Sequence, residues 1–174
     1  IGFNAATSGS YQFILDASSE VPSLTVTSVS PSVDCSALAD SNDDIPFDIA
    51  GSGQLFVKGD HSGWGADEAY RLHYKGNNTY QAVAEFSGDM QFKLASDDGN
   101  WATQLWAQAD NSSDINSENL VLGVSYSVAY EDAGTNNNKT SLASGQYSFL
   151  LTLNEDNPAK GSDVGSLIIQ QCQP

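Results

Sequence analysis

Three tryptophans and one lysine are the residues of this chain whose types and spacing best suit a chemical role. All three tryptophans lie within residues 55–106, together with Lys93. An exposed indole face desolvates well and attracts the polarised C–H groups of a flat, partly apolar ligand such as a sugar ring. This segment therefore predicts a binding surface, and carbohydrate is the ligand class that fits it.

The surroundings of each tryptophan separate surface candidates from core residues. Trp64 is flanked by glycines in a turn between two expected strands, which favours an exposed ring. Trp101 follows a run of turn-forming residues, so we expect its ring near the surface at the start of a strand. Trp106 alternates with Gln104 and fits either the core or a third aromatic contact. The expected aromatic platforms are therefore Trp64 and Trp101.

Lys93 lies between Phe92 and Leu94 in an alternating strand pattern. Because successive side chains of a strand point to opposite faces, we expect the lysine to point outward while its two neighbours point inward. An outward ammonium group can donate hydrogen bonds to sugar hydroxyl groups. The alternative is a solvated strand lysine that touches no ligand.

The chain offers little for catalysis or metal binding. It has two histidines, and no serine lies in a Gly-x-Ser-x-Gly elbow. Residues 110–118 carry several oxygen ligands but lack the central glycine and the spacing of a calcium-binding EF-hand loop. Cys35 and Cys172 belong to no zinc-binding or redox motif, and a disulfide between them stays open. We expect a protein that is not an enzyme and holds no cofactor or metal.

The composition excludes several classes of partner. With 22 acidic and 6 basic residues, the net charge of −16 repels nucleic acid and anionic membrane surfaces. No apolar run approaches the roughly 20 residues that a membrane helix requires. Abundant small polar residues and few lysines are typical of exported bacterial modules, so we expect a secreted, extracellular or cell-surface protein. No signal peptide is visible, which favours a processed or excised piece of a longer chain.

Short alternating strands must position these side chains. Helical periodicity never extends beyond a turn or two, whereas strand patterns separated by Gly, Asn, Asp and Ser recur along the chain. This spacing predicts an all-β protein with an antiparallel, immunoglobulin-like β-sandwich. The expected strands are residues 54–58, 70–74, 79–86, 90–95, 102–107, 119–122, 124–130, 146–153 and 164–171.

Two segments of the chain also resemble each other. Residues 8–15, SGSYQFIL, align with residues 144–151, SGQYSFLL, and a cysteine follows the tyrosine after 24 residues in the first copy and 25 in the second. A repeat of this period predicts domains, so residues 1–44 are expected to be the last strands of a preceding similar module or an N-terminal appendage. Residues 45–174 would form the complete carbohydrate-binding module. The alternative is a chance likeness between hairpin strands.

Several motifs in their order along the chain resemble a known family. The residues that carry this resemblance are Leu55-Phe56-Val57-Lys58-Gly59-Asp60, Gly63-Trp64-Gly65, Phe92-Lys93-Leu94-Ala95 and Trp101. They look like the starch-binding and glycogen-binding β-sandwich modules of carbohydrate-binding module families 20 and 48, closest to accessory modules of secreted bacterial pullulanases and α-amylases. The match spans residues 53–106. It departs from the family pattern at His61-Ser62 and in the longer loop before Trp101.

The resemblance implies a non-catalytic module that binds α-1,4-glucan. Trp64 and Trp101 would grip consecutive glucose units, Lys93 would donate hydrogen bonds between them, and Asn100 would add a polar contact. Neighbouring modules of the same polypeptide are the other partners it implies. Two alternatives remain: a structural immunoglobulin-like spacer without a ligand, and a binder of another polysaccharide such as chitin or cellulose. The first predicts tryptophans that are buried or far apart, and the second predicts coplanar rings.

Overall fold

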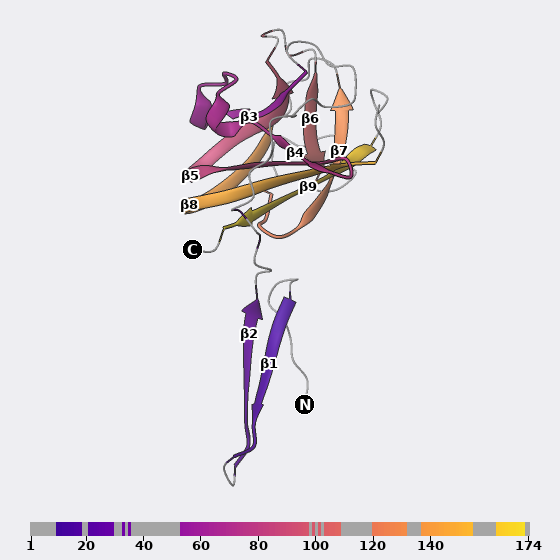
Figure 1. Ribbon diagram of the computed structural model, residues 1–174. Helices are drawn as coiled ribbons and strands as arrows, with labels where there is room; N and C mark the ends of the chain where they lie inside the picture. The colour runs from indigo at the N-terminus through magenta and orange to yellow at the C-terminus, as the bar shows by residue number, and fades with distance from the viewer. Residues whose placement is uncertain are drawn as a thin grey trace. The chain divides into compact units, whose positions relative to one another are not determined.

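Antiparallel strands joined by turns make up the described part of the chain, as the alternating sequence predicts. The computed structural model describes residues 10–18, 21–29, 33, 35, 53–97, 99, 101, 103–108, 120–131, 137–154 and 163–172 (Figure 1). By its internal contacts the chain divides into two units, residues 1–32 and residues 33–174. In the described residues, no helix is long and apolar enough to cross a membrane.

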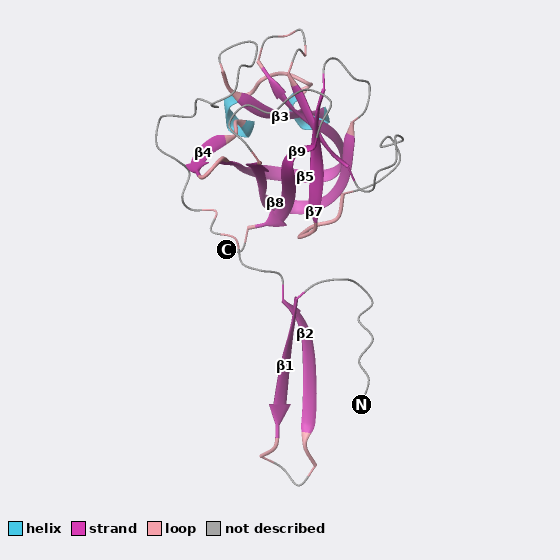
Figure 2. Ribbon diagram, turned by 90° about the vertical axis from the view of Figure 1, so that its right-hand side faces the viewer, coloured by secondary structure: helices cyan, strands magenta, loops and turns pink. Residues whose placement is uncertain are grey.

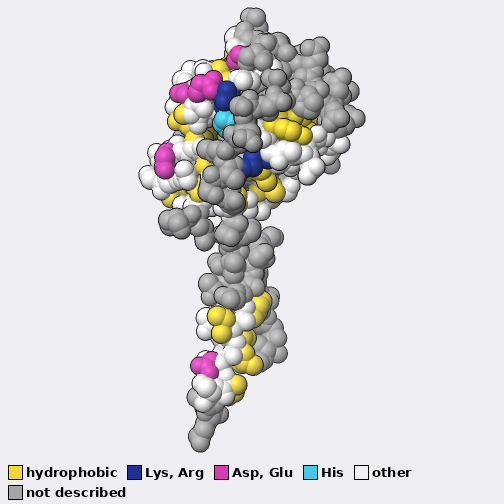
Figure 3. All heavy atoms as spheres, viewed as in Figure 1, with side chains coloured by type: hydrophobic (Ala, Val, Ile, Leu, Met, Phe, Trp, Pro, Cys, Tyr) yellow, Lys and Arg dark blue, Asp and Glu magenta, His cyan; other side chains and the backbone are white. Residues whose placement is uncertain are grey.

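The first unit contains a hairpin of β1 (Ser10–Asp16) and β2 (Ser23–Val29). The strands pair antiparallel, with Phe13 opposite Val26 and Leu15 opposite Leu24. Phe13 and Leu15 are 55% and 66% exposed, and Figure 3 shows apolar side chains along the surface of this hairpin. Whether the hairpin belongs to a preceding copy of the module stays a prediction.

The second unit holds the remaining strands and two single-turn 3-10 helices. The elements are β3 (Leu55–Gly59), η1 (Asp60–Ser62), η2 (Glu68–Tyr70), β4 (His73–Gly76), β5 (Thr79–Ser96), β6 (Gln104–Gln108), β7 (Ser125–Glu131), β8 (Asn138–Leu153) and β9 (Asp163–Gln171). The all-β, antiparallel prediction is therefore confirmed. Two expected strands, 79–86 and 90–95, are one long strand, whose register against β8 shifts between Phe86 and Gly88. Residues 120–122, expected to lie in a strand, lie outside the named strands.

Strand pairing in this unit closes on itself. From β5 the hydrogen-bonded order runs through β6, β7, β9 and β8, and β8 pairs with β5 again. β3 and β4 extend β5 at two separate places along its length. Figure 2 shows these strands curving around a common centre. Because the pairing of β5 with β8 closes the sheet, the fold is barrel-like as well as sandwich-like.

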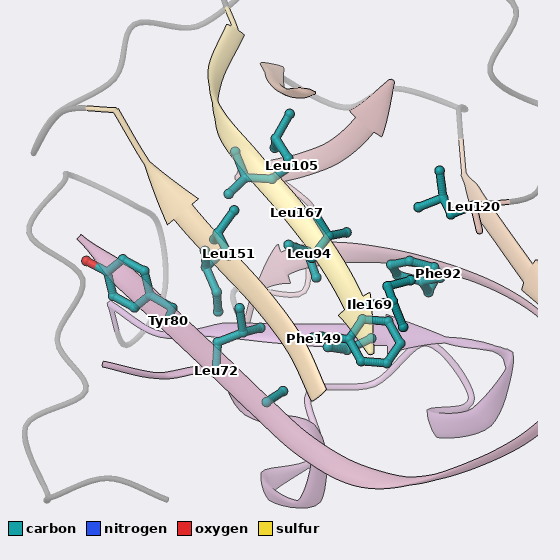
Figure 4. Close-up of a cluster of buried hydrophobic side chains, with 14 of the residues drawn as sticks. Leu72, Tyr80, Phe92, Leu94, Leu105, Leu120, Phe149, Leu151, Leu167 and Ile169 are labelled. Carbon is teal, nitrogen blue, oxygen red and sulfur yellow. The ribbon is translucent and has the colours of Figure 1, made fainter. Parts of the chain in front are cut away.

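The core lies inside this closed sheet and consists of alternate side chains from nearly every strand. Figure 4 shows Phe92 and Leu94 of β5 in one cluster with Leu151, Leu167 and other fully buried side chains. Strands β3 and β6 both pair with β5 near its end. One face of these three strands supplies core residues, so the side chains that alternate with the core residues along each strand must lie on the opposite face. That opposite face carries the candidate site.

Cys35 and Cys172 form a disulfide, with their Cα atoms 5.8 Å apart. Both cysteines belong to the second unit. The bond ties residue 35 to the residue that directly follows β9. The sequence left this pairing open, and proximity in the fold decides it.

Candidate functional site

A tight turn after β3 carries Trp64. β3 ends at Gly59, η1 follows, and Gly63 and Trp64 both adopt the left-handed conformation, with φ of 57° and 64°. The Trp64 amide donates a hydrogen bond of 2.9 Å to the Gly59 carbonyl and closes the turn. A Cβ atom at Gly59 would lie 2.2 Å from the Gln91 carbonyl oxygen of β5. Only glycine therefore lets the turn pass this close to β5.

Asp60 holds the indole of Trp64 in place. Its Oδ1 accepts a hydrogen bond of 3.1 Å from Trp64 Nε1, and its Oδ2 accepts one of 2.9 Å from the backbone N–H of Gln91. One carboxylate thus connects the ring to the backbone of β5. Hydrogen bonds to a charged acceptor are stronger than those between neutral groups, so the ring is well anchored although it is partly exposed.

His61 supports the same turn from the inside. Its ring packs edge-on against Tyr70 and Phe86, with centroid distances of 4.4 and 4.9 Å. Nε2 donates a hydrogen bond of 2.9 Å to the Val57 carbonyl, and Nδ1 is buried without a hydrogen-bond partner. Burial lowers the pKa of His61, which favours the neutral ring. His61 therefore stabilises the turn by packing.

Trp101 lies before β6 and is held from two sides. Its φ of 58° is also left-handed, and its carbonyl accepts a hydrogen bond of 2.6 Å from Gln104 Nε2. Lys58 Nζ lies 3.9 Å from the centroid of its indole ring, which is a cation–π contact, while Lys93 Nζ lies 5.9 Å away. The backbone and the ring of Trp101 thus have separate partners.

The two lysines lie side by side under Trp101. Lys58 of β3 is directly opposite Lys93 of β5, and the two residues are only 3% and 5% exposed. Lys58 Nζ donates to the Ser96 carbonyl at 3.1 Å, and Lys93 Nζ donates to Gln104 Oε1 at 2.6 Å. Both ammonium groups are therefore covered and hydrogen-bonded to the protein.

This burial corrects one expectation about Lys93. As predicted, the lysine lies on the opposite face from Phe92 and Leu94, but it does not reach into solvent. Trp101 and Gln104 lie close to the ammonium group, and burial lowers the pKa of Lys93. Alternation gave the correct side of the sheet. It could not reveal that a neighbouring segment covers that side.

The two aromatic residues expected to act together are in fact neighbours. Trp64 and Trp101 have ring centroids 5.9 Å apart and an interplanar angle of 60°. Both side chains are partly exposed. The rings form an angled pair at the surface, although 37 residues separate them in the sequence. We call Trp64 and Trp101 the tryptophan pair.

Both members of the tryptophan pair have a backbone conformation that bulky residues rarely adopt. Among the described residues, four other than glycine have positive φ, namely Trp64, Asn77, Asn78 and Trp101. The asparagines form the turn between β4 and β5, where this conformation is common. For a tryptophan it is an outlier that costs about 1–3 kcal/mol, and such strain is concentrated at functional sites. The fold therefore holds the backbone of each tryptophan in a conformation that the residue itself disfavours.

Three supporting residues, namely Lys58, Asp60 and Gln104, were assigned no role in the site from the sequence. Lys58 and Asp60 lie in the motif Leu55-Phe56-Val57-Lys58-Gly59-Asp60 that carries the family resemblance, which was the signal available for them. Asn100 and the candidate calcium loop 110–118 lie outside the described residues, as does the side chain of Trp106, whose backbone pairs with Ala129. Within the described ranges, no group of three or more His, Cys, Asp or Glu could hold a metal ion.

Comparisons with known proteins give one informative likeness. No family model and no curated protein matches the chain. The chain is similar to a solved structure described as the ligand-induced structure of AmyP-SBD, a starch-binding domain. The likeness covers 84% of this chain and 95% of the other, with a TM-score of 0.50 and 22% sequence identity. At this identity the likeness concerns the fold.

Proposed function

We propose that this protein is a non-catalytic carbohydrate-binding module that binds α-1,4-linked glucans such as starch, glycogen, maltooligosaccharides and pullulan. The observation that carries the proposal is the tryptophan pair, two partly exposed indoles 5.9 Å apart and tilted by 60°. Each ring offers an apolar face to one sugar unit. The tilt suits two consecutive units of a chain that curves.

The geometry of the pair favours this function over the two alternatives. A spacer without a ligand predicts tryptophans that are buried or far apart, whereas these are partly exposed and adjacent. A binder of cellulose or chitin predicts coplanar rings that match a flat chain, whereas the interplanar angle is 60°. The angled pair therefore supports an α-glucan.

The fold comparison supports the same ligand class. The similar structure is that of a starch-binding domain, and the likeness extends over most of both chains. It also supports a binding module over an enzyme. Membership of carbohydrate-binding module families 20 or 48, and attachment to a secreted amylolytic enzyme such as a pullulanase, are further parts of the proposal that rest on the sequence motifs.

An exported location completes the proposal. The Cys35–Cys172 disulfide supports it, because such bonds persist in oxidising compartments and are rare in the cytosol. The acidic, serine-rich and asparagine-rich composition points the same way. A single small site of this kind should bind in the micromolar to millimolar range, so neighbouring modules on the same polypeptide would raise the avidity.

Affinity electrophoresis tests the proposal at low cost. In a gel containing amylopectin or glycogen, the protein should migrate more slowly than in a control gel without polysaccharide. The retardation should be lost in Trp64→Ala and in Trp101→Ala but kept in Phe13→Ala, an exposed aromatic residue of the first unit. Unchanged mobility of the unmodified protein would sink the proposal. Retention by cellulose or chitin without retention by amylopectin would transfer the site to a flat polysaccharide.

A further inference from the structure

We infer that Lys58 is a positioning residue of this site, which fixes the ring of Trp101 by a buried cation–π contact and does not touch the sugar. The inference rests on the proposed function. It differs from the role that the sequence motifs suggest, in which the strand lysine Lys93 is the polar contact to the ligand.

The contact geometry is the first argument. Lys58 Nζ lies 3.9 Å from the centroid of the Trp101 ring, close enough for a strong cation–π attraction, and its side chain is only 3% exposed. The attraction is stronger when the ammonium group is desolvated, as it is here. Lys58 is thus bound to the ring and hidden from solvent.

The cost of keeping a lysine there is the second argument. An ammonium group loses hydration when it is buried, and Lys58 lies directly opposite a second buried lysine, Lys93. Like charges at facing positions of two paired strands destabilise a sheet. An apolar residue at position 58 would avoid both penalties. Two contacts that help to offset them are the hydrogen bond to the Ser96 carbonyl and the face of the Trp101 ring.

The two lysines act on different parts of Trp101. Lys93 Nζ is 5.9 Å from the ring centroid and bonds to Gln104, whose amide bonds to the Trp101 carbonyl. These two hydrogen bonds fix the strained backbone of Trp101. Lys58 reaches the ring itself, so it controls how the ring is oriented relative to Trp64.

The position of Lys58 also explains why it cannot act as a ligand contact. Its ammonium group occupies one face of the Trp101 ring, so a sugar must stack on the other face. The indole then separates the cation from the sugar. A ring that is already oriented before binding loses less conformational freedom when the ligand arrives, which raises affinity.

Nuclear magnetic resonance of the unmodified protein gives the first test. Protons that lie over an aromatic ring are shifted upfield, so the Lys58 Hε protons should resonate upfield of those of Lys75, an exposed lysine of β4. The shift should vanish in Trp101→Ala and persist when the protein is saturated with maltoheptaose. Absence of the shift, or its loss on adding maltoheptaose, would overturn the inference.

Substitution of the lysine gives the second test. Lys58→Met keeps an unbranched side chain, one heavy atom shorter and without the charge. Lys58→Arg keeps a cation, and Lys75→Met is the matched control. Coupled indoles give paired circular dichroism bands of opposite sign, so these bands report the orientation of the tryptophan pair. We expect Lys58→Met to weaken the bands and to lower the affinity for maltoheptaose by roughly 3- to 30-fold, the range of a cation–π contact. Lys75→Met should change neither.

The outcomes separate this inference from the proposed function. Tighter binding by Lys58→Arg than by Lys58→Met supports a role for the cation, and equal binding by the two variants overturns it. Lost affinity with unchanged paired bands would make Lys58 a direct ligand contact, and weakened bands with full affinity would show that binding does not need the orientation. If the unmodified protein binds no glucan, the proposed function fails, while the proton shifts and the paired bands still test the contact.

Discussion

Trp64 and Trp101 are the same residue in the same strained conformation, yet the protein holds them in different ways. The indole N–H of Trp64 donates a hydrogen bond to the carboxylate of Asp60, four residues earlier. The ring of Trp101 rests on the ammonium group of Lys58, which is 43 residues earlier in the chain. One platform is fixed by an anion of its own turn, and the other by a cation of a different strand.

This difference shows that one site can depend on both local and long-range interactions: Trp64 is held mainly by a local contact and Trp101 by long-range contacts. The Trp64 turn is held mainly by hydrogen bonds between its own residues, although Asp60 also accepts a hydrogen bond from the backbone N–H of Gln91 in β5. The orientation of Trp101 depends on Lys58 of β3, Lys93 of β5 and Gln104 of β6, which lie close together only because these strands are paired. Local changes should therefore affect Trp64 first, and changes at the strand lysines should affect Trp101.

The largest effect is expected from removing a ring. A stacked base on an aromatic side chain is worth about 1–3 kcal/mol, and by analogy each ring should contribute a similar amount to binding a sugar unit. Isothermal titration with maltoheptaose should show roughly 5- to 150-fold weaker binding for Trp64→Ala and for Trp101→Ala. Trp101→Ala should also lower the free energy of unfolding, because Lys58 then loses its cation–π contact and keeps the Ser96 carbonyl. Unchanged affinity in either variant would remove that ring from the site.

The backbone of the Trp64 turn should be the next most sensitive feature. A Cβ atom in Gly59→Ala would collide with the Gln91 carbonyl of β5, so we expect a loss of about 1–3 kcal/mol in the free energy of unfolding. Urea titration measures it. In the control Gly65→Ala, the new Cβ would lie 3.5 Å from the Ser62 carbonyl, an ordinary contact. Equal stability of the two variants would contradict the close approach of the turn to β5.

A smaller effect is expected when Asp60 loses its charge. In Asp60→Asn the side chain has one acceptor oxygen, so it cannot accept from both Trp64 Nε1 and the Gln91 amide. Because the bond between Trp64 and Asp60 is exposed to solvent, we take the contribution of an ordinary hydrogen bond, about 0.5–1.5 kcal/mol, which predicts roughly 2- to 13-fold weaker binding of maltoheptaose. Asp89→Asn, an exposed aspartate of β5, is the matched control. Wild-type affinity in Asp60→Asn would show that Trp64 needs no anchor.

The smallest effect is expected from acidification, which should lower the stability of the Trp64 turn through His61. Burial lowers the pKa of His61, so the unfolded chain binds a proton more readily than the folded one. The stability that the neutral ring contributes is complete above the ordinary histidine pKa of about 6.5 and is lost as the pH falls through that value toward the lowered one. The free energy of unfolding should therefore decrease over this window, and less steeply in His61→Asn. Identical slopes in both proteins would exclude His61 as the cause.

Much of the site could be predicted from the sequence because its signals are local. Glycines around Trp64 and turn-forming residues before Trp101 indicated surface rings, and the structure brings these two together. Alternation placed Lys93 on the correct face of its strand. The ligand roles of Trp64, Lys93, Trp101 and Asn100 stay predictions, and Asn100 lies outside the described residues.

The supporting residues could not be predicted in the same way. Asp60, Lys58 and Gln104 resemble ordinary surface residues until the strands that carry them are paired. The repeated pattern shows the same limit: Phe149 and Leu151 of β8 are fully buried, whereas Phe13 and Leu15 of β1 are exposed. The same arrangement of aromatic and aliphatic residues thus has two environments, because burial depends on what packs against a strand.

The sequence by itself determined the all-β fold, the antiparallel strands and the identity of the two surface tryptophans, because alternation and turn propensity act between neighbouring residues. The tertiary structure alone decided the angle between the rings, the burial of the two lysines and the pairing of Cys35 with Cys172. These features depend on distances between residues remote in the chain, which exist only once the strands have paired.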